Sequence, residues 1–163
     1  MRRVARESKG PGTIYFTGGA SMLLWGIRDQ TIDVDIKLDP EPKGIFEAIA
    51  SLKNELELNI ELASPEDFIP APPDWRERSL LIQIIAEIGF YHYDPRMQAL
   101  AKLERGYEQD VADCAELLKR GIVQAQELRE TFSAIRPFLI RFPAIDANEF
   151  ERKVSLLLSG YEE

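Results

Sequence analysis

Two aspartates, Asp33 and Asp35, stand two positions apart in a run that alternates polar and apolar residues, Thr31-Ile32-Asp33-Val34-Asp35-Ile36. Such alternation is typical of a half-buried strand, in which residues i and i+2 point to the same face. The two carboxylates therefore lie side by side and repel each other unless water or a cation separates them. A Mg²⁺ ion held by two carboxylates and by the phosphates of a substrate suits such a pair, and a solvated strand edge is the structural alternative.

A glycine pair, Gly18-Gly19, precedes the aspartates and follows the apolar run Ile14-Tyr15-Phe16. We expect a buried strand, a tight turn at the glycines and a short helix over 21–25. Backbone N–H groups at a glycine turn that opens a helix can hold a phosphate. Because residues 20–32 suffice for one helix and a turn, the two strands can be neighbours. A phosphate-binding turn beside a carboxylate pair indicates nucleotide chemistry.

This order of glycine turn, short helix and Asp-x-Asp strand resembles the signature of the nucleotidyltransferase superfamily, which has the polymerase-beta-like fold. Over nearly its whole length, the chain resembles more closely the small bacterial nucleotidyltransferase-like proteins of the DUF6036 type. The closer likeness lies in 13–21 (TIYFTGGAS), 59–70 (NIELASPEDFIP), 91–94 (YHYD) and 98–106 (QALAKLERG). A weaker likeness links these proteins to the nucleotidyltransferase-like toxins of abortive-infection systems.

The resemblance implies a role for each motif residue. Gly18, Gly19 and Ser21 would hold the triphosphate of an NTP, with the hydroxyl or the N–H of Ser21 facing a phosphate oxygen. Asp33 and Asp35 would bind one or two Mg²⁺ ions, which neutralise charge on the attacked phosphorus and on the leaving pyrophosphate.

Nucleotidyltransferases commonly carry a third carboxylate on a neighbouring strand, as a general base or a further metal ligand. The next alternating run, 57–62, offers Glu61 for this role. Asp67 competes, but 64–67 (SPED) reads as a helix start in which Asp67 caps the first turn. Glutamate is longer than the aspartate often found in this role, and a solvated strand face is the structural alternative for Glu61.

In similar abortive-infection toxins, a lysine and an aspartate downstream of the metal pair contribute to nucleotide handling. Lys102 and Asp110 are the matching residues here. The structural alternative is a salt-bridge network that joins these two residues to Arg105 and Asp113.

Two other features receive structural interpretations. His92 is the lone histidine, and we expect a hydrogen-bonded, partly buried side chain rather than a proton relay or a metal ligand. The basic start of the chain, residues 1–9, allows a turn or two of helix, and we expect it to fray.

The remaining pattern predicts an α/β (α+β) fold, a small mixed sheet with flanking helices and a helical C-terminal half. We expect one nucleotidyltransferase-like domain over 1–163, with a sheet core over about 11–93 and a helical part over about 94–163. Strands are expected near 13–17, 31–38, 57–62 and 80–93, an amphipathic helix near 45–52, and four further helices at 96–106, 108–120, 124–135 and 146–158. In the second of these four helices, we expect Val111, Cys114, Leu118 and Ile122 to face the core.

The composition fits a compact domain with a hydrophobic core, since 45% of the residues are hydrophobic and 29% are charged. A net charge of -8 argues against tight, non-specific binding of nucleic acid. The single cysteine, Cys114, excludes an internal disulfide. Because neither an apolar run of membrane-spanning length nor a signal-peptide core is visible, we expect a cytoplasmic protein.

The favoured function is Mg²⁺-dependent transfer of a nucleoside monophosphate from an NTP to an acceptor, which could be RNA, a protein or a small molecule. Asp33, Asp35 and Ser21 favour this enzyme. The alternative is a non-catalytic module of the same fold that binds a partner protein, for example as half of a toxin–antitoxin pair, and the glutamate at the third carboxylate position favours it. A nucleotide-binding sensor without an acceptor is the third hypothesis.

Overall fold

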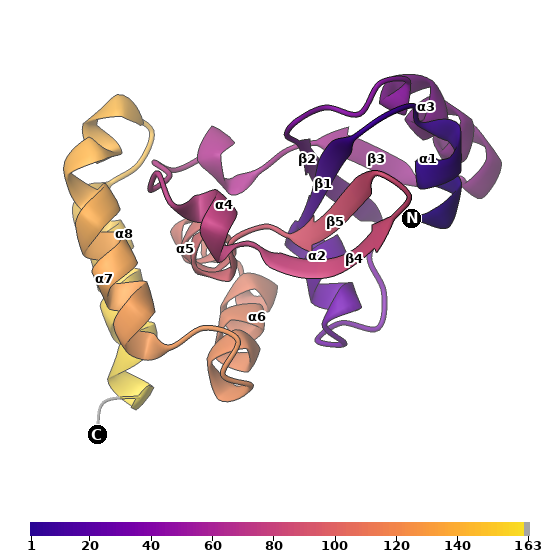
Figure 1. Ribbon diagram of the computed structural model, residues 1–163. Helices are drawn as coiled ribbons and strands as arrows, with labels where there is room; N and C mark the ends of the chain where they lie inside the picture. The colour runs from indigo at the N-terminus through magenta and orange to yellow at the C-terminus, as the bar shows by residue number, and fades with distance from the viewer. Residues whose placement is uncertain (162–163) are drawn as a thin grey trace. The chain divides into compact units, whose positions relative to one another are not determined.

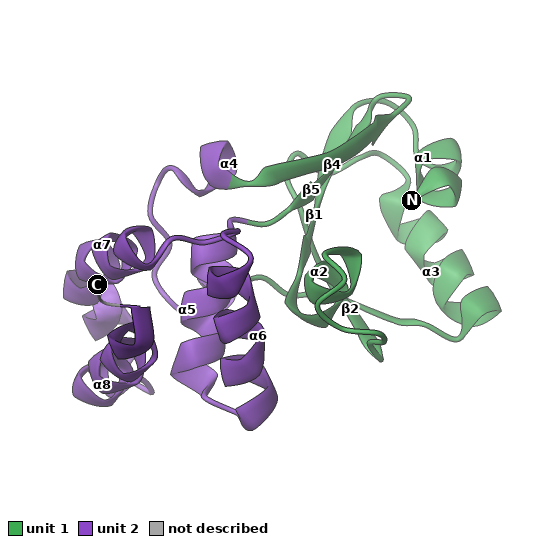
Figure 2. Ribbon diagram, turned by 90° about the horizontal axis from the view of Figure 1, so that it is seen from below, with its two compact units in different colours: residues 1–64, 79–93 green, residues 65–78, 94–163 purple. Residues whose placement is uncertain are grey.

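The computed structural model describes residues 1–161 (Figure 1). It has the predicted mixed α/β architecture, with one five-stranded sheet followed by a helical C-terminal part. The chain divides into two compact units (Figure 2): the sheet unit, Met1–Ser64 with Ser79–Tyr93, and the helical unit, Pro65–Arg78 with the chain from Asp94 onward. The helical unit thus resumes where the sequence predicts the change to helices. Pro65–Arg78 departs from the prediction, because we expected it within the sheet core.

The strands of the sheet unit lie where the hydrophobic alternation predicts them. They are β1 (Gly12–Thr17), β2 (Asp33–Leu38), β3 (Asn59–Leu62), β4 (Leu80–Ile85) and β5 (Ile88–His92). Their order in the sheet is β3-β2-β1-β5-β4. The pairs β1–β2 and β4–β5 are antiparallel, whereas β1–β5 and β2–β3 are parallel. The fourth predicted region is a hairpin, because Ala86 adopts a left-handed conformation with φ 54° and turns the chain between β4 and β5.

One face of the sheet carries the core of this unit. The helices of the unit are α1 (Arg2–Glu7), α2 (Gly18–Leu24) and α3 (Ile45–Leu56). Residues from α1, α3, β1, β2 and β5 form its main hydrophobic cluster: Val4, Ala5, Ile14, Ile36, Ile45, Leu52, Ile88 and Phe90. The expected fraying of the N-terminal segment is therefore wrong. The two apolar side chains of α1, Val4 and Ala5, are buried in this cluster, and that burial stabilises a helix too short to form alone.

The helical unit contains the four predicted helices, each within a residue of its expected ends. They are α5 (Pro95–Arg105), α6 (Glu108–Lys119), α7 (Ala125–Ile135) and α8 (Ala147–Leu158). Short elements accompany them: η1 (Pro65–Asp67), α4 (Trp75–Arg78), η2 (Arg136–Arg141) and η3 (Ser159–Tyr161). The predicted helix start at 64–67 thus forms a single 3-10 turn. Within residues 1–161, no helix has both the length and the apolar character needed to cross a membrane.

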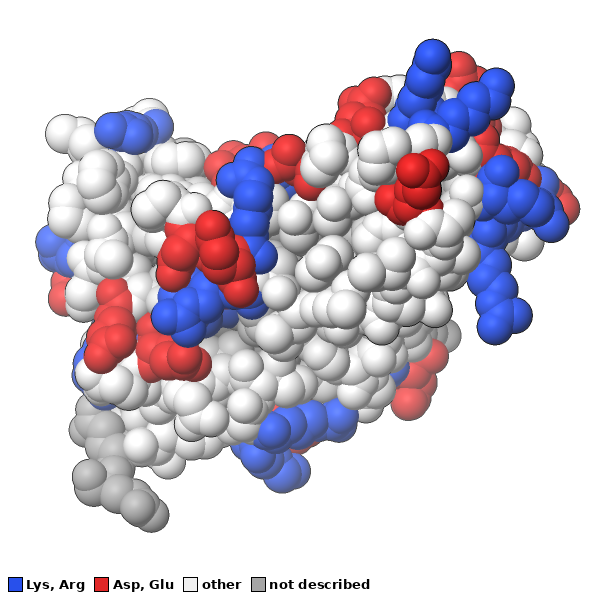
Figure 3. Space-filling model, in the orientation of Figure 1, with Lys and Arg blue, Asp and Glu red and all other residues white. Residues whose placement is uncertain are grey.

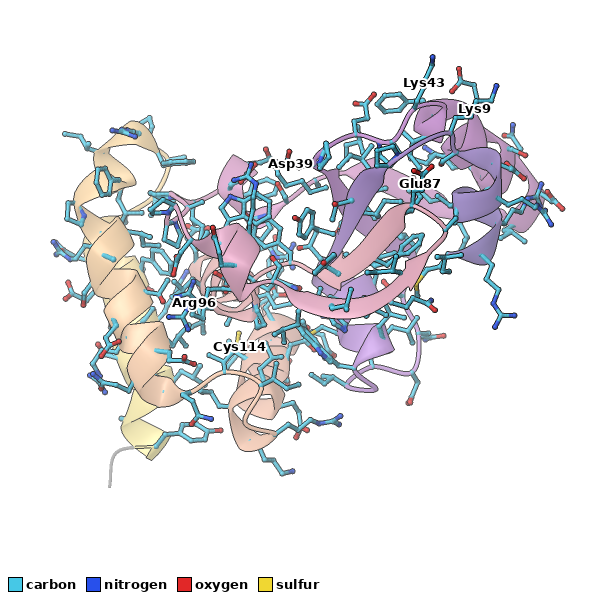
Figure 4. The ribbon with its side chains drawn as sticks, viewed as in Figure 1. Lys9, Asp39, Lys43, Glu87, Arg96 and Cys114 are labelled. Carbon is cyan, nitrogen blue, oxygen red and sulfur yellow. The ribbon has the colours of Figure 1, made fainter. Side chains whose placement is uncertain are left out.

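Ion pairs explain why Pro65–Arg78 belongs to the helical unit. The guanidinium of Arg96, labelled in Figure 4, lies 2.6 Å from Asp94 Oδ2 and 3.2 Å from Asp74 Oδ1. Arg78 Nη1 lies 3.2 Å from Glu127 Oε1 on α7. Since these partners are distant in the sequence, the local pattern of the segment does not reveal them.

The buried face of α6 includes the predicted Cys114 and Leu118 but differs from the prediction at Val111. Val111 is exposed, and Asp110 and Asp113 are buried together with Cys114 and Leu117. The Cys114 thiol, also labelled in Figure 4, donates to the carbonyl of Ala99 at 3.4 Å. The count of apolar residues fails at Val111 and misses the two buried aspartates, because cations on α5 neutralise them, as described below.

Candidate functional site

The predicted carboxylates share one face of the sheet. The strand register pairs Asp33 with Asn59 and Asp35 with both Glu61 and Thr17. These side chains lie on the face opposite the hydrophobic cluster, because Ile36, which follows Asp35 on β2, is buried in that cluster. The period of two in the sequence thus places Asp33, Asp35 and Glu61 on the same side.

The glycine pair, which we expected as a turn before a helix over 21–25, forms the first two residues of α2 and lies against one of these carboxylates. Gly18 has a φ of +58°, and a Cβ built on it would lie 2.7 Å from Asp35 Oδ2. A Cβ on Gly19 would meet the hydroxyl oxygen of Thr31. The left-handed backbone at position 18 favours glycine, and an added Cβ would have to displace the end of the Asp35 side chain. The structure therefore brings together the predicted phosphate-binding turn and the predicted metal pair.

An amide that sequence reasoning did not assign to the site connects two of the carboxylates. Asn59 Nδ2 donates to Asp33 Oδ1 at 2.7 Å and to Glu61 Oε1 at 2.9 Å. Its position on the acidic face of the alternating run is the signal that could have identified it. Within the described part of the chain, no three acidic, histidine or cysteine side chains form a group arranged to hold a metal ion.

Glu61 and Asp67, the two candidates for the third carboxylate, occupy different units. Glu61 lies on β3, the strand that pairs with the strand of Asp35. Asp67 ends the 3-10 turn η1 of the helical unit. The register therefore favours Glu61, and its role in catalysis stays a prediction.

Ser21 points into the core of the sheet unit. Its Oγ lies 2.6 Å from Nδ1 of His92, and both side chains are buried. The imidazole of His92 also stacks on Trp25, with 3.9 Å between ring centroids. Burial lowers the pKa of His92 to about 4, so the ring is neutral at neutral pH. The expectation of a buried, hydrogen-bonded histidine is confirmed. The hydroxyl of Ser21 serves this pair, and phosphate binding by Ser21 stays a prediction.

Lys102 and Asp110 belong to the helical unit, where they form the salt-bridge network proposed as the structural alternative. Lys102 Nζ lies 2.7 Å from Asp113 Oδ2 and 3.3 Å from Asp110 Oδ1, and all three side chains are buried. Arg105 donates twice to Asp110, at 2.7 Å each. Burial acts to raise the pKa of Asp110, but the bonds from Arg105 and the charge of Lys102 outweigh it and lower that pKa. Nucleotide binding by Lys102 and Asp110 stays a prediction.

A cavity of about 420 Å³ lies on the opposite, apolar side of the sheet unit. Apart from Arg3 and Thr31, its lining is apolar, with Leu23, Leu24 and Leu52 among the wall residues. Arg3 is paired with Glu7 and Glu55. A triphosphate needs several donors, so the carboxylate face with its glycine turn is the better candidate for nucleotide chemistry.

The comparisons with known proteins bear on the family of the chain. Neither the curated proteins nor the solved structures gave a match to the chain. Residues 1–159 match the family described as nucleotidyltransferase of unknown function, DUF6036. Because the match covers nearly the whole chain, the protein belongs to the DUF6036 family of nucleotidyltransferases of unknown function.

Proposed function

We propose that the protein is a Mg²⁺-dependent nucleotidyltransferase that moves a nucleoside monophosphate from an NTP to an acceptor hydroxyl. The contact between Gly18 and the carboxylate of Asp35 is the observation that carries the proposal. A glycine backbone of the kind that binds phosphates, next to carboxylates of the kind that bind a divalent cation, supports this reaction. Membership of the family supports the reaction class.

The side chains present fit a magnesium ion by their chemistry. Asp33, Asp35 and Glu61 offer hard carboxylate oxygens on one face of the sheet, which is the donor type that Mg²⁺ prefers. The absence of a Cβ at Gly18 leaves the approach to Asp35 Oδ2 open. When bound, Mg²⁺ would neutralise charge on the transferred phosphoryl group and on the leaving pyrophosphate.

The residues of the chain then have distinct tasks. Backbone N–H groups of Gly18 and Gly19 would bind the triphosphate, and Asp33 and Asp35 would hold its metal. Glu61 accepts the proton of the acceptor hydroxyl, whose oxygen bonds to the α-phosphorus as the bond to pyrophosphate breaks. Asn59, through its bond to Glu61 Oε1, orients that carboxylate.

Calorimetric titration of an NTP, with and without Mg²⁺, tests the proposal. In the Asp33→Asn, Asp35→Asn double variant, we expect the metal-dependent affinity to fall by at least about 100-fold with the fold intact. Glu61→Gln should lower turnover, whereas Asp67→Asn, the matched control, should not. A folded wild type that binds no NTP in the presence of Mg²⁺ would overturn the proposal.

One observation favours the alternative of a partner-binding module of the same fold. The amide of Asn59 already satisfies one oxygen of Asp33 and one of Glu61, so the carboxylates are stabilised without a metal. The partner would be a protein, as in a toxin–antitoxin pair. The same titration separates the two functions, because a module needs no nucleotide. RNA, proteins and small molecules are all acceptors to be tried once NTP binding is established.

A further inference from the structure

The strand β4 is one edge of the five-stranded sheet. It pairs with β5 on one side, and no strand lies on its other side among residues 1–161. An edge strand presents a row of backbone N–H and C=O groups to which another strand can pair. The backbone groups of this edge are therefore arranged to pair with another extended strand.

Unlike most edge strands, β4 lacks charged residues and proline. Its sequence is Leu80-Leu81-Ile82-Gln83-Ile84-Ile85, in a chain whose net charge is -8. Leu81 and Ile84 are 55% and 63% exposed. Figure 3 shows an uncharged surface over β4, with charged side chains gathered elsewhere. The opposite edge, β3, has four residues and carries Glu61, which discourages pairing there.

A shift of register makes this edge self-complementary. Leu81 pairs with Tyr91 and Ile84 pairs with Gly89, with an irregularity in β4 between Leu81 and Gln83. Tyr91 and Gly89 are two residues apart on β5 and so share a face. Leu81 and Ile84 therefore also share a face, although they are three residues apart.

We propose that β4 pairs with β4 of a second copy of this chain, antiparallel and across a two-fold axis, so that the two sheets become continuous. With the axis between Ile82 and Gln83, Leu81 of each copy faces Ile84 of the other. Both Leu81–Ile84 pairs lie on the same face of the sheet, and in each pair the two exposed side chains pack against each other across the strands. A second copy fits this edge because a two-fold interface uses the same patch twice and this patch brings no like charges together.

Sedimentation equilibrium of the full chain tests the proposal. We expect the wild type to approach twice the chain mass of 18.6 kDa. Ile84→Lys should raise the dimer dissociation constant at least about 10-fold, because it places a lysine opposite Leu81 of the other copy. The matched control is Ile140→Lys, which changes an 87% exposed isoleucine in the helical unit and should leave the dimer intact.

A mixing experiment tests the register. Ile84→Lys and Leu81→Glu proteins should each be monomeric alone. Mixed, they should form a heterodimer, because one pair becomes Lys–Glu and the other stays Leu–Ile. Circular dichroism of each variant establishes that it is folded. A monomeric wild type, an Ile84→Lys dimer as tight as wild type, a dimer lost equally in Ile140→Lys, or no heterodimer on mixing would each overturn the proposal.

Discussion

Ser21 and His92 are separated by 71 positions in the chain, yet Ser21 Oγ and His92 Nδ1 are 2.6 Å apart in the core of the sheet unit. Ser21 lies on α2, the helix that begins at Gly18, and His92 ends β5. This hydrogen bond therefore fixes the helix that begins with the glycine pair onto the sheet. It also gives the lone histidine a structural task next to the candidate site.

Removing either partner of this pair should destabilise the protein. We expect Ser21→Ala or His92→Phe to cost about 1–3 kcal/mol, because each removes a buried hydrogen bond between the two side chains. The double variant should cost less than the sum of the single variants, as measured by urea unfolding in a double-mutant cycle. Ser133→Ala, at an exposed site, is the control. Strict additivity would contradict the coupling.

The buried imidazole also predicts a dependence of stability on pH. Burial lowers the pKa of His92 from 6.5 to about 4, so in this window the unfolded chain takes up a proton that the folded chain does not. The free energy of unfolding should therefore fall as the pH falls from 6.5 toward 4. Between about pH 7 and about pH 5, the contribution of His92 should amount to about 2 kcal/mol.

Urea unfolding of wild type and His92→Phe at both pH values measures this contribution. The variant should lose less stability on acidification than wild type, since the carboxylates titrate in both proteins. Equal losses in the two proteins would show that His92 titrates at its ordinary pKa.

Gly18→Ala should have a larger effect than backbone strain alone would produce, because it also disturbs the candidate site. Gly10 and Gly18 both have positive φ, but a Cβ at Gly10 meets nothing within 4 Å, whereas one at Gly18 meets Asp35. Gly10→Ala should therefore cost about 1 kcal/mol from backbone strain. Gly18→Ala should cost more and should also weaken Mg²⁺-dependent NTP binding. Calorimetric titration of both variants with an NTP and Mg²⁺ measures this effect. Equal NTP affinities of Gly10→Ala and Gly18→Ala would contradict a role for the contact between Gly18 and Asp35.

Lys102 should be essential to the stability of the helical unit. In Lys102→Met, the buried carboxylate of Asp113 loses its cation at 2.7 Å, which should cost about 3–5 kcal/mol in urea unfolding. Lys119→Met, at a side chain that is 74% exposed, should change the stability by less than about 0.5 kcal/mol. Lys102→Met, Asp113→Asn should recover part of the loss. A Lys102→Met protein as stable as wild type would contradict the network.

Local periodicity predicted much of this fold. The period of two placed Asp33 and Asp35 on one face, and glycine and proline signals set the helix ends, as at Gly106, which adopts φ 74° after α5. These signals lie within a few residues of the elements they define, so a single sequence is enough to predict them.

Features that depend on distant partners were not predictable in this way. The orientation of Ser21 depends on His92, and the bridge at Asn59 depends on the register between β2 and β3. In each case the deciding interaction joins elements whose pairing appears only in the fold.

The reactivity of the lone cysteine, Cys114, can report local opening of the helical unit. The Cys114 thiol is fully buried between α5 and α6, and burial raises its pKa to about 12, so a thiol reagent finds almost no thiolate in the closed state. Labelling under native conditions therefore proceeds only through molecules in which these helices have separated. The rate of Cys114 labelling therefore measures the free energy of that opening, independently of any event in the sheet unit.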